Sequence, residues 1–575
     1  MFDKILTNGR KLLYSSQDTV LSAASIIMIM SVTSRILGLV RQRFLALYFP
    51  PVKLSLFFAA FRLPDLIFEI LVFGAFSSAF IPVFARVFKK NKKKAWETAG
   101  RTLNIGLLLF IPFAIIVLIW TRQIYRLMLP GFTDFEVNQV VVIARILIFA
   151  QIFFVMSYVF TGILESLRHF LVPAVAPLFY NLGIILGTFF LTPKFGILAP
   201  AIGAALGAFG HFSIQFFPSL KLGFRFSKIV RPNEEVKRVG RLAIPRMIDV
   251  SVEQVQKTVE LTLASLISTA SYTYYTFANT LQVLPVSLFG TSLAKASLPV
   301  LSSQTGNLSQ FRKTLMTAIY QVLFLTFPTA TLLIVLRIPI VRLIYGTSIF
   351  DWQATVQTGL VLSAFAVGVP FQSMVTIFSR AFFALHDTKT PVVVSLGGMA
   401  LGILGDIVGV KIFSLPVWIL AFSFSAEMLI ESFILFILLN KRIEGIYSKD
   451  TFKHLVKLLI SVLPSGLTMY FLLKFFDRSV WVKRLSFITN LQVLRNIQFE
   501  RFVLDTRYTV NLLALTLFVA LVGAIIFLAI SLLLRSEELQ NFLTLIKRII
   551  RPKILAIPAK EEESLSPTTS DTTPS

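Results

Sequence analysis

The chain has 575 residues, of which 55% are hydrophobic and 15% are charged. A soluble protein could not bury so much apolar surface, so the composition excludes a soluble globular domain and indicates a polytopic membrane protein. The formal net charge is +26, which we attribute to basic cytoplasmic loops facing anionic lipid, and we expect no nucleic-acid partner.

Long apolar runs separated by charged loops recur along the chain, beginning with sixteen uncharged residues at 19–34. Such a run predicts a membrane-spanning helix, because a span in lipid must satisfy its own backbone hydrogen bonds. We expect fourteen spans, at 19–47, 54–88, 99–121, 137–165, 170–192, 196–221, 238–268, 271–302, 311–337, 352–385, 388–412, 415–440, 452–476 and 508–535. The predicted fold class is an all-α polytopic membrane protein.

Loop charges predict the orientation of these spans. The loops after the second, sixth and twelfth spans are rich in lysine and arginine, which places them and both termini in the cytoplasm. The loop at 477–507 is also basic although the count of spans places it outside, but long loops follow the rule poorly. Its alternating apolar pattern predicts an interfacial helix at 480–505, lying on the membrane surface.

The chain also repeats itself at a nearly constant offset. Pro82 and Pro299 end two spans in similar contexts 217 residues apart, and Pro173 and Pro391 open two spans 218 residues apart. The offset predicts two six-helix halves, as in alternating-access transporters, with chance similarity of apolar helices as the alternative. We expect a cytoplasmic N-terminus at 1–18, an N-lobe at 19–221, a basic linker at 222–237, a C-lobe at 238–440, two C-terminal helices within 452–535, and a basic, then acidic, disordered tail at 545–575.

Arginines interrupt the first two spans. Arg35 lies about 16 residues, or ~24 Å, into the first span. An arginine at mid-membrane costs roughly 2.5–3.5 kcal/mol, and such residues usually face a bundle interior or a water-filled cavity. We therefore expect Arg35, Arg41 and Arg62 to face one cavity for an anionic substrate, helped by a local helix break near Gly38. The alternative is that these side chains extend to the membrane interface, which suits Arg41 and Arg43 best.

The seventh span is the most highly charged of the fourteen. It carries Arg246, Asp249, Glu253, Lys257 and Glu260. Because spans 1, 2, 7 and 8 are equivalent pairs in the two halves, their charges predict a central cavity, with a structural salt-bridge network as the alternative. Asp249 and Asp406 lie on different spans and form a candidate cation site.

The sequence gives no sign of catalytic chemistry. Cysteine is absent and the four histidines are scattered, so we expect no disulfide, thiol nucleophile, metal or cofactor. No phosphate-binding loop, zinc-protease motif or nucleophile elbow occurs, and no stretch outside the membrane is large enough for a catalytic domain. We therefore expect a protein that is not an enzyme.

Six motifs in one order resemble the MurJ/MviN family of bacterial lipid II flippases. They are SRILGLVRQRF, AFRLP, GAFSSAFIPV, FLVPAVAPLFYNLG, SVEQ with LASL in the seventh span, and ALHDTKTPV, and the resemblance covers about residues 19–440. It implies an inner-membrane protein of the multidrug/oligosaccharidyl-lipid/polysaccharide exporter superfamily. It also implies two lobes forming a V, a cationic central cavity, and a groove at the last two spans for a polyprenyl tail. The family moves undecaprenyl-pyrophosphate disaccharide-pentapeptide to the outer leaflet, driven by membrane potential or Na⁺.

The resemblance also assigns residues. The substrate-binding positions that match the family are Ser34, Arg35, Arg41, Arg62, Gln254 and Glu260. The chain departs from the family at Gln42, where an Asp is common, and at Phe68 and Thr280, where the family has arginine. Candidate cations to restore the cavity charge are Arg43, Arg246 and Lys257.

Three other functions remain open on the sequence alone. A flippase for another polyprenyl-linked glycan would share almost every feature. A cation-coupled drug exporter would instead have an acidic, aromatic cavity. A membrane scaffold that recruits cell-wall enzymes without transport is the third, and it is compatible with the missing basic residues at Phe68 and Thr280.

Overall fold

The computed structural model describes residues 20–69, 79–443, 445, 449–477 and 504–540. In these ranges the chain is helical, and an isolated bridge joins Asp477 to Leu504. The first helices are α2 (Val20–Tyr48), α3 (Pro51–Phe68), α4 (Ile81–Lys90), α5 (Lys92–Met128), α6 (Asp134–Ser166), α7 (Leu171–Phe195) and α8 (Ala199–Lys221). The predicted N-terminus, the interfacial segment predicted at 480–505 up to residue 503, and the C-terminal tail lie outside the described residues.

The second half of the chain continues the same helical pattern. Its helices are α9 (Glu234–Ile267), α10 (Ser271–Pro285), the π-helix η4 (Val286–Thr291), α11 (Ser292–Ser303), α12 (Leu308–Val335), α13 (Arg337–Tyr345), α14 (Trp352–Ala384), α15 (Lys389–Ile407), the π-helix η5 (Val408–Ile412), α16 (Trp418–Arg442), α17 (Lys449–Phe476) and α19 (Thr509–Leu533). The all-α membrane class predicted from the sequence is therefore confirmed.

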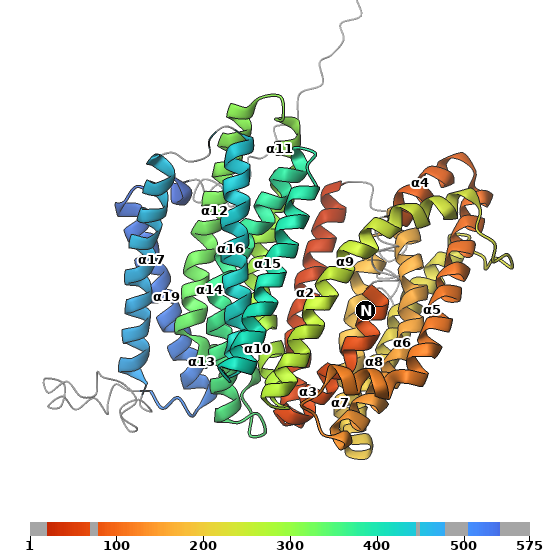
Figure 1. The fold of residues 1–575 in the computed structure, drawn as a ribbon, viewed down its shortest axis with the longest axis horizontal. Helices are drawn as coiled ribbons and strands as arrows, with labels where there is room; N and C mark the ends of the chain where they lie inside the picture. The colour runs from red at the N-terminus through yellow and green to blue at the C-terminus, as the bar shows by residue number, and fades with distance from the viewer. Residues whose placement is uncertain (1–19, 70–78, 444, 446–448, 478–503, 541–575) are drawn as a thin grey trace, which may run out of the picture.

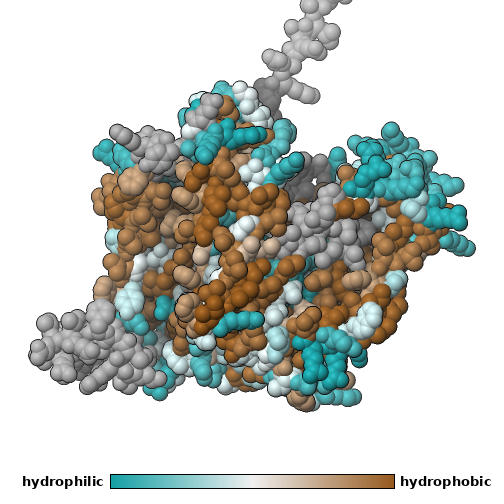
Figure 2. Space-filling model, in the orientation of Figure 1, coloured by the Kyte–Doolittle hydropathy of each residue, from teal (hydrophilic) through white to brown (hydrophobic). Residues whose placement is uncertain are grey.

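Ten segments of the described chain are long and apolar enough to cross a membrane. One of them, Leu171–Lys221, contains two of the predicted spans. The predicted spans outside this set are the first, second and seventh, which are the ones that carry the arginines and acids discussed above. Figure 2 shows a hydrophobic belt on the surface of the molecule, between two hydrophilic ends. The count of fourteen spans stays a prediction.

Two groups of helices form separate lobes on the two sides of Figure 1. In the first lobe α6 packs against α3, α5 and α8, and α7 packs against α2 and α8. The α7–α8 contact depends on small residues, because a Cβ added to Gly183 would lie 2.4 Å from the Cα of Gly207. In the second lobe α14 packs against α10, α12 and α16. The two C-terminal helices α17 and α19 pack on each other beside α12 and α13.

The lobes join at one end of the molecule, where α3 contacts α10 and α2 contacts α13. Ser55 Oγ and Thr273 Oγ1 are 2.8 Å apart across this contact, and the rings of Phe277 and Tyr345 stack at 4.1 Å. We call this contact, with Gln42 of α2, the closed end. Toward the opposite end, where α4 and α11 lie, the ribbons of the two lobes diverge in Figure 1. Helix α9 crosses between the lobes and contacts α3, α5, α10 and α15.

Candidate functional site

Arg35 reaches from the first lobe to the second. It lies on α2, which runs through Gly38 without interruption, so the predicted helix break is wrong. An unbroken helix keeps its backbone hydrogen bonds, which lipid would otherwise leave unsatisfied. The Arg35 guanidinium donates to the hydroxyl of Ser287 in η4. Arg35 is exposed, and with Ser34 it lines a cavity of about 470 Å³ bounded by α2, α6, α7 and α8.

Arg62 is buried at the contact between α3 and α9, with 6% of its surface exposed. Its Nε donates to Thr258 Oγ1 at 3.1 Å, and its Nη2 donates to the backbone oxygen of Gln254 at 2.8 Å and to the side-chain oxygen of the same residue. The Gln254 amide in turn donates to the carboxylate of Glu69. The sequence predicts Arg62 and Gln254 as separate substrate-binding residues. In the structure they belong to one chain of hydrogen bonds.

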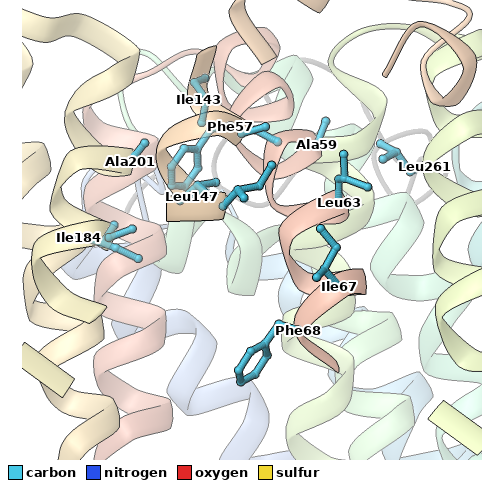
Figure 3. Packing of buried hydrophobic residues seen from close by; sticks show 14 of the residues in the cluster. Phe57, Ala59, Leu63, Ile67, Phe68, Ile143, Leu147, Ile184, Ala201 and Leu261 are labelled. Carbon is cyan, nitrogen blue, oxygen red and sulfur yellow. The ribbon is translucent and has the colours of Figure 1, made fainter. Parts of the chain in front are cut away.

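Hydrophobic contacts fix the helix that carries Arg62. Phe57, Leu63 and Ile67 of α3 lie in one buried cluster with Ile143 and Leu147 of α6 (Figure 3). This packing buries one side of α3 in the first lobe. Arg62 lies where α3 contacts α9.

Phe68, at a position where the family has arginine, belongs to an aromatic cluster of the first lobe. Its ring lies 5.1 Å from the ring of Tyr158 and 5.7 Å from that of Phe154, between ring centroids. The position therefore contributes apolar packing to α6 where an arginine would have placed a charge.

Arg41 lies close enough to Asp65, Tyr180 and Tyr345 for electrostatic interaction. Its Nε is buried and has no hydrogen-bond partner in the described part of the chain. Gln151 donates to Asp65 Oδ1 at 3.4 Å. The arginines of α2 and α3 thus lie along the interface of the lobes, and their facing one shared cavity stays a prediction.

Two departures from the family pattern contact each other. Gln42 Nε2 donates to Thr280 Oγ1 at 2.9 Å, and the Tyr345 hydroxyl donates to Gln42 Oε1 at 2.7 Å. Gln42 is 4% exposed, so an acid and an arginine at these positions would have formed an ion pair at the closed end. A neutral hydrogen-bonded pair takes its place. Both departures are visible in the sequence. Their contact is not, because the two residues are 238 positions apart.

Arg43 has a structural position. Its Nη1 donates to the backbone oxygens of Leu343, Ile344 and Gly346, at 3.1, 3.2 and 3.0 Å. These carbonyls close the C-terminal end of α13, where a helix attracts a cation. We therefore assign Arg43 to capping α13, and its predicted contribution to the cavity charge stays a prediction.

The remaining charged residues of α9 form two groups, those whose side chains are described and those whose side chains are not. The side chains of Arg246 and Asp249 lie outside the described residues, so the predicted pairing of Asp249 with Asp406 stays untested. Lys257 is half-buried and close to Asp65, and Glu260 is buried beside Tyr275 and Asp406. One helix therefore supplies charge to both lobes.

An acidic cluster lies inside the second lobe, between α9, α15 and α16. It contains Glu260, Asp406, Glu427 and Glu431, each less than 9% exposed. Neutral donors hold two of them: Gln256 Nε2 donates to Glu427 at 2.9 Å, and Ser395 donates to Glu431. Asp406 Oδ1 is buried and has no hydrogen-bond partner among the described residues. No group of three or more His, Cys, Asp or Glu with metal-site geometry occurs in the described ranges.

Comparison with known proteins places the chain in a family. The model of the family described as lipid II flippase MurJ matches residues 45–492. The probable lipid II flippase MurJ of Borreliella burgdorferi is 26% identical over 470 residues, which cover 80% of this chain and 91% of that protein. The probable lipid II flippase MurJ of Rhizobium meliloti is 29% identical over 381 residues, covering 63% and 70%.

Solved structures share the fold. A lipid II flippase MurJ in an inward closed conformation matches with a TM-score of 0.70 and 23% identity, covering 91% of this chain and 99% of that one. An inward-facing multidrug resistance transporter of the MATE family, in the MOP superfamily, matches with a TM-score of 0.61 and 16% identity, covering 72% and 95%. Because the family model spans most of its length, the chain belongs to the lipid II flippase MurJ family.

Proposed function

We propose that this multi-pass protein of the bacterial inner membrane flips lipid II from the inner to the outer leaflet by alternating access. The observation that carries the proposal is Arg35, an exposed arginine within the membrane-spanning region that lines a cavity and reaches the opposite lobe. Substrate binding at Arg35, Ser34, Arg41, Arg62, Gln254 and Glu260 is part of the proposal.

The chemistry of a pyrophosphate fits this position. A pyrophosphate carries about two negative charges and loses its hydration when it enters the membrane, so it requires desolvated cationic partners. The planar guanidinium of Arg35 can donate two parallel hydrogen bonds to phosphate oxygens. Ser287 is a neutral partner, so an anion that replaces it exchanges a hydrogen bond with one charged partner for an ion pair.

Alternating access follows from the two ends of the interface. The lobes are packed together at the closed end, where Gln42 contacts Thr280 and Ser55 contacts Thr273. Opening that end breaks these hydrogen bonds, the bonds of Arg43 to α13, and the contact of the Phe58 ring with that of Phe277. A substrate bound at Arg35 could supply part of this free energy by bringing the lobes together on the opposite side.

Several finer statements belong to the same proposal. Both termini are cytoplasmic, as the basic loops indicate. The protein is a transporter without enzymatic activity, and its partners are a lipid-linked glycan, membrane lipids and proteins of cell-wall synthesis. Coupling to Na⁺ or to the membrane potential would act at the acidic cluster, where the buried, unpartnered Oδ1 of Asp406 is an oxygen ligand of the kind that hard cations prefer.

The test is rescue of a strain depleted of this protein. We expect Arg35→Ala to abolish rescue at normal membrane abundance, and Arg35→Lys to rescue in part because lysine keeps the charge but loses the planar fork. Arg126→Ala is the matched control, since Arg126 is exposed and pairs with Asp134 at 3.5 Å on the surface. Full rescue by Arg35→Ala would contradict the proposal.

The lipid that accumulates on depletion separates the alternatives. Accumulation of lipid II in the inner leaflet supports the proposal, whereas accumulation of a different polyprenyl-linked glycan would identify another flippase. A scaffold for cell-wall enzymes predicts that Arg35→Ala has no effect on growth.

A further inference from the structure

The cavity beside Arg35 extends into the first lobe and is lined by polar side chains. It occupies about 470 Å³ between α2, α6, α7 and α8. This volume is within the roughly 300–1,000 Å³ typical of small-molecule sites. Its polar lining residues are Ser31, Ser34, Arg35, Tyr158, Thr161, Glu165 and His211. The rest of the lining is apolar and includes Ile27, Met30 and Phe170. The cavity therefore suits a ligand that has both polar groups and apolar faces.

A chain of hydrogen bonds on α6 and α8 orients His211. Thr161 Oγ1 donates to Gln215 Oε1 at 2.6 Å, which fixes the orientation of the Gln215 amide. The amide nitrogen then faces Ser157, to whose Oγ it donates at 2.6 Å, and it lies 3.4 Å from His211 Nδ1. Two donors therefore surround one nitrogen of the imidazole.

One tautomer of His211 fits both this arrangement and the cavity. Ser157 Oγ accepts from Gln215, and its own proton has two acceptors, His211 Nδ1 at 2.7 Å and the His211 backbone oxygen at 3.3 Å. When Ser157 donates to Nδ1, the imidazole carries its proton on Nε2. His211 is 6% exposed and lines the cavity. In this tautomer the relay ends in an N–H donor at the cavity.

The other lining groups complement this donor. Glu165 is half-buried and supplies acceptors, while Thr161, Ser31 and Ser34 supply hydroxyl groups that can donate and accept. Arg35 lies at the side of the cavity that faces the second lobe, because it also reaches Ser287. The polar groups within the cavity can bond to the hydroxyl groups of a ligand, and Arg35 at its side can bind an adjacent anionic group.

We propose that this cavity binds the saccharide part of the lipid-linked head group, next to the pyrophosphate at Arg35. A sugar oxygen accepts from His211 Nε2–H, and a sugar hydroxyl donates to Glu165. This inference rests on the proposed function, and it adds the site that distinguishes a glycosylated carrier from the bare lipid pyrophosphate.

The test measures binding of two probes, lipid II and undecaprenyl pyrophosphate, to the full chain in nanodiscs. We expect His211→Asn to weaken lipid II binding about tenfold, the effect of one lost hydrogen bond, and to leave undecaprenyl pyrophosphate binding unchanged. Asparagine keeps an acceptor near Ser157 but cannot reach the position of Nε2. His211→Gln extends an amide toward that position and should restore part of the affinity.

Two further variants make the result interpretable. His386→Asn is the matched control, because His386 is exposed in the loop between α14 and α15, with a positive φ that asparagine tolerates, and this variant should bind both probes normally. Arg35→Ala should weaken both probes, which tests the proposed function separately. Equal loss of both probes in His211→Asn, or no loss of either, would overturn the saccharide site while leaving the role of Arg35 intact.

Discussion

The closed end of the interface and the cavity at Arg35 join the same two lobes with different chemistry. At the closed end most partners are neutral: Gln42 bonds to Thr280, and the ring of Phe58 lies 5.6 Å from that of Phe277 between ring centroids. The cation there, Arg43, donates to main-chain oxygens of α13. At the cavity Arg35 donates to the hydroxyl of Ser287 in the other lobe. The comparison indicates that the charge of Arg35 is available to a ligand, whereas the charge of Arg43 is held by the backbone of the second lobe.

The largest expected effect comes from Arg62, which joins α3 of the first lobe to α9. Arg62→Ala should destabilise the protein by several kcal/mol, because it removes the donor to both oxygens of Gln254, and each buried acceptor left unsatisfied costs about 1–3 kcal/mol. Thermal unfolding in detergent and abundance in membranes would measure the loss. Arg62→Met, which keeps the side-chain volume, should recover little if the hydrogen bonds dominate. An unchanged melting temperature for both variants would mean that these hydrogen bonds do not hold α3 to α9.

A smaller effect should follow from changing the charge of the closed end. Gln42→Asp and Thr280→Arg each place a charge at a neutral contact, and each should destabilise the protein by about 1–3 kcal/mol. The double variant should recover part of that loss, with a coupling energy of about 0.5–3 kcal/mol, because an ion pair replaces the hydrogen bond. Unfolding of the four proteins of this cycle gives the coupling. Strict additivity would show that the two positions act independently.

The smallest expected effect concerns the cap of α13. Arg43→Ala should cost about 0.3–1 kcal/mol, the usual contribution of a cation at a helix C-terminus. Hydrogen exchange at Leu343 and Ile344 should become faster, while exchange in α14 stays the same. Arg43→Lys should keep most of the protection. Loss of transport with unchanged hydrogen exchange would instead indicate that Arg43 acts in the cavity.

The sequence predicted which residues are unusual better than it predicted their partners. Apolar runs located the helices, and the charges of Arg35 and Arg62 were visible against them. Their partners Ser287 and Gln254 are 252 and 192 residues away, and no local pattern encodes such a contact. The hydrophobic pattern also cannot reveal a π-helix such as η4, because it changes the backbone without changing composition.

The cationic site followed from local chemistry, whereas the polar relay behind it did not. His211 is one histidine in an apolar run, and its partner Ser157 comes from a different helix. Thr161 and Gln215 are ordinary polar residues 54 positions apart. Only the packing of α6 on α8 brings them together, so a sequence gives no reason to select them.

The separation of Arg43 from its carbonyl partners has a consequence for synthesis. Gly346 follows Arg43 by 303 residues, and at roughly 5–20 residues per second the ribosome needs on the order of 15–60 s to reach it. During that time α2 is in the membrane before its partner α13 in the second lobe exists. Its arginines must then be accommodated by water, lipid head groups or the insertion machinery. The slowest step in the maturation of this protein is therefore expected to be the docking of the second lobe onto a helix inserted long before.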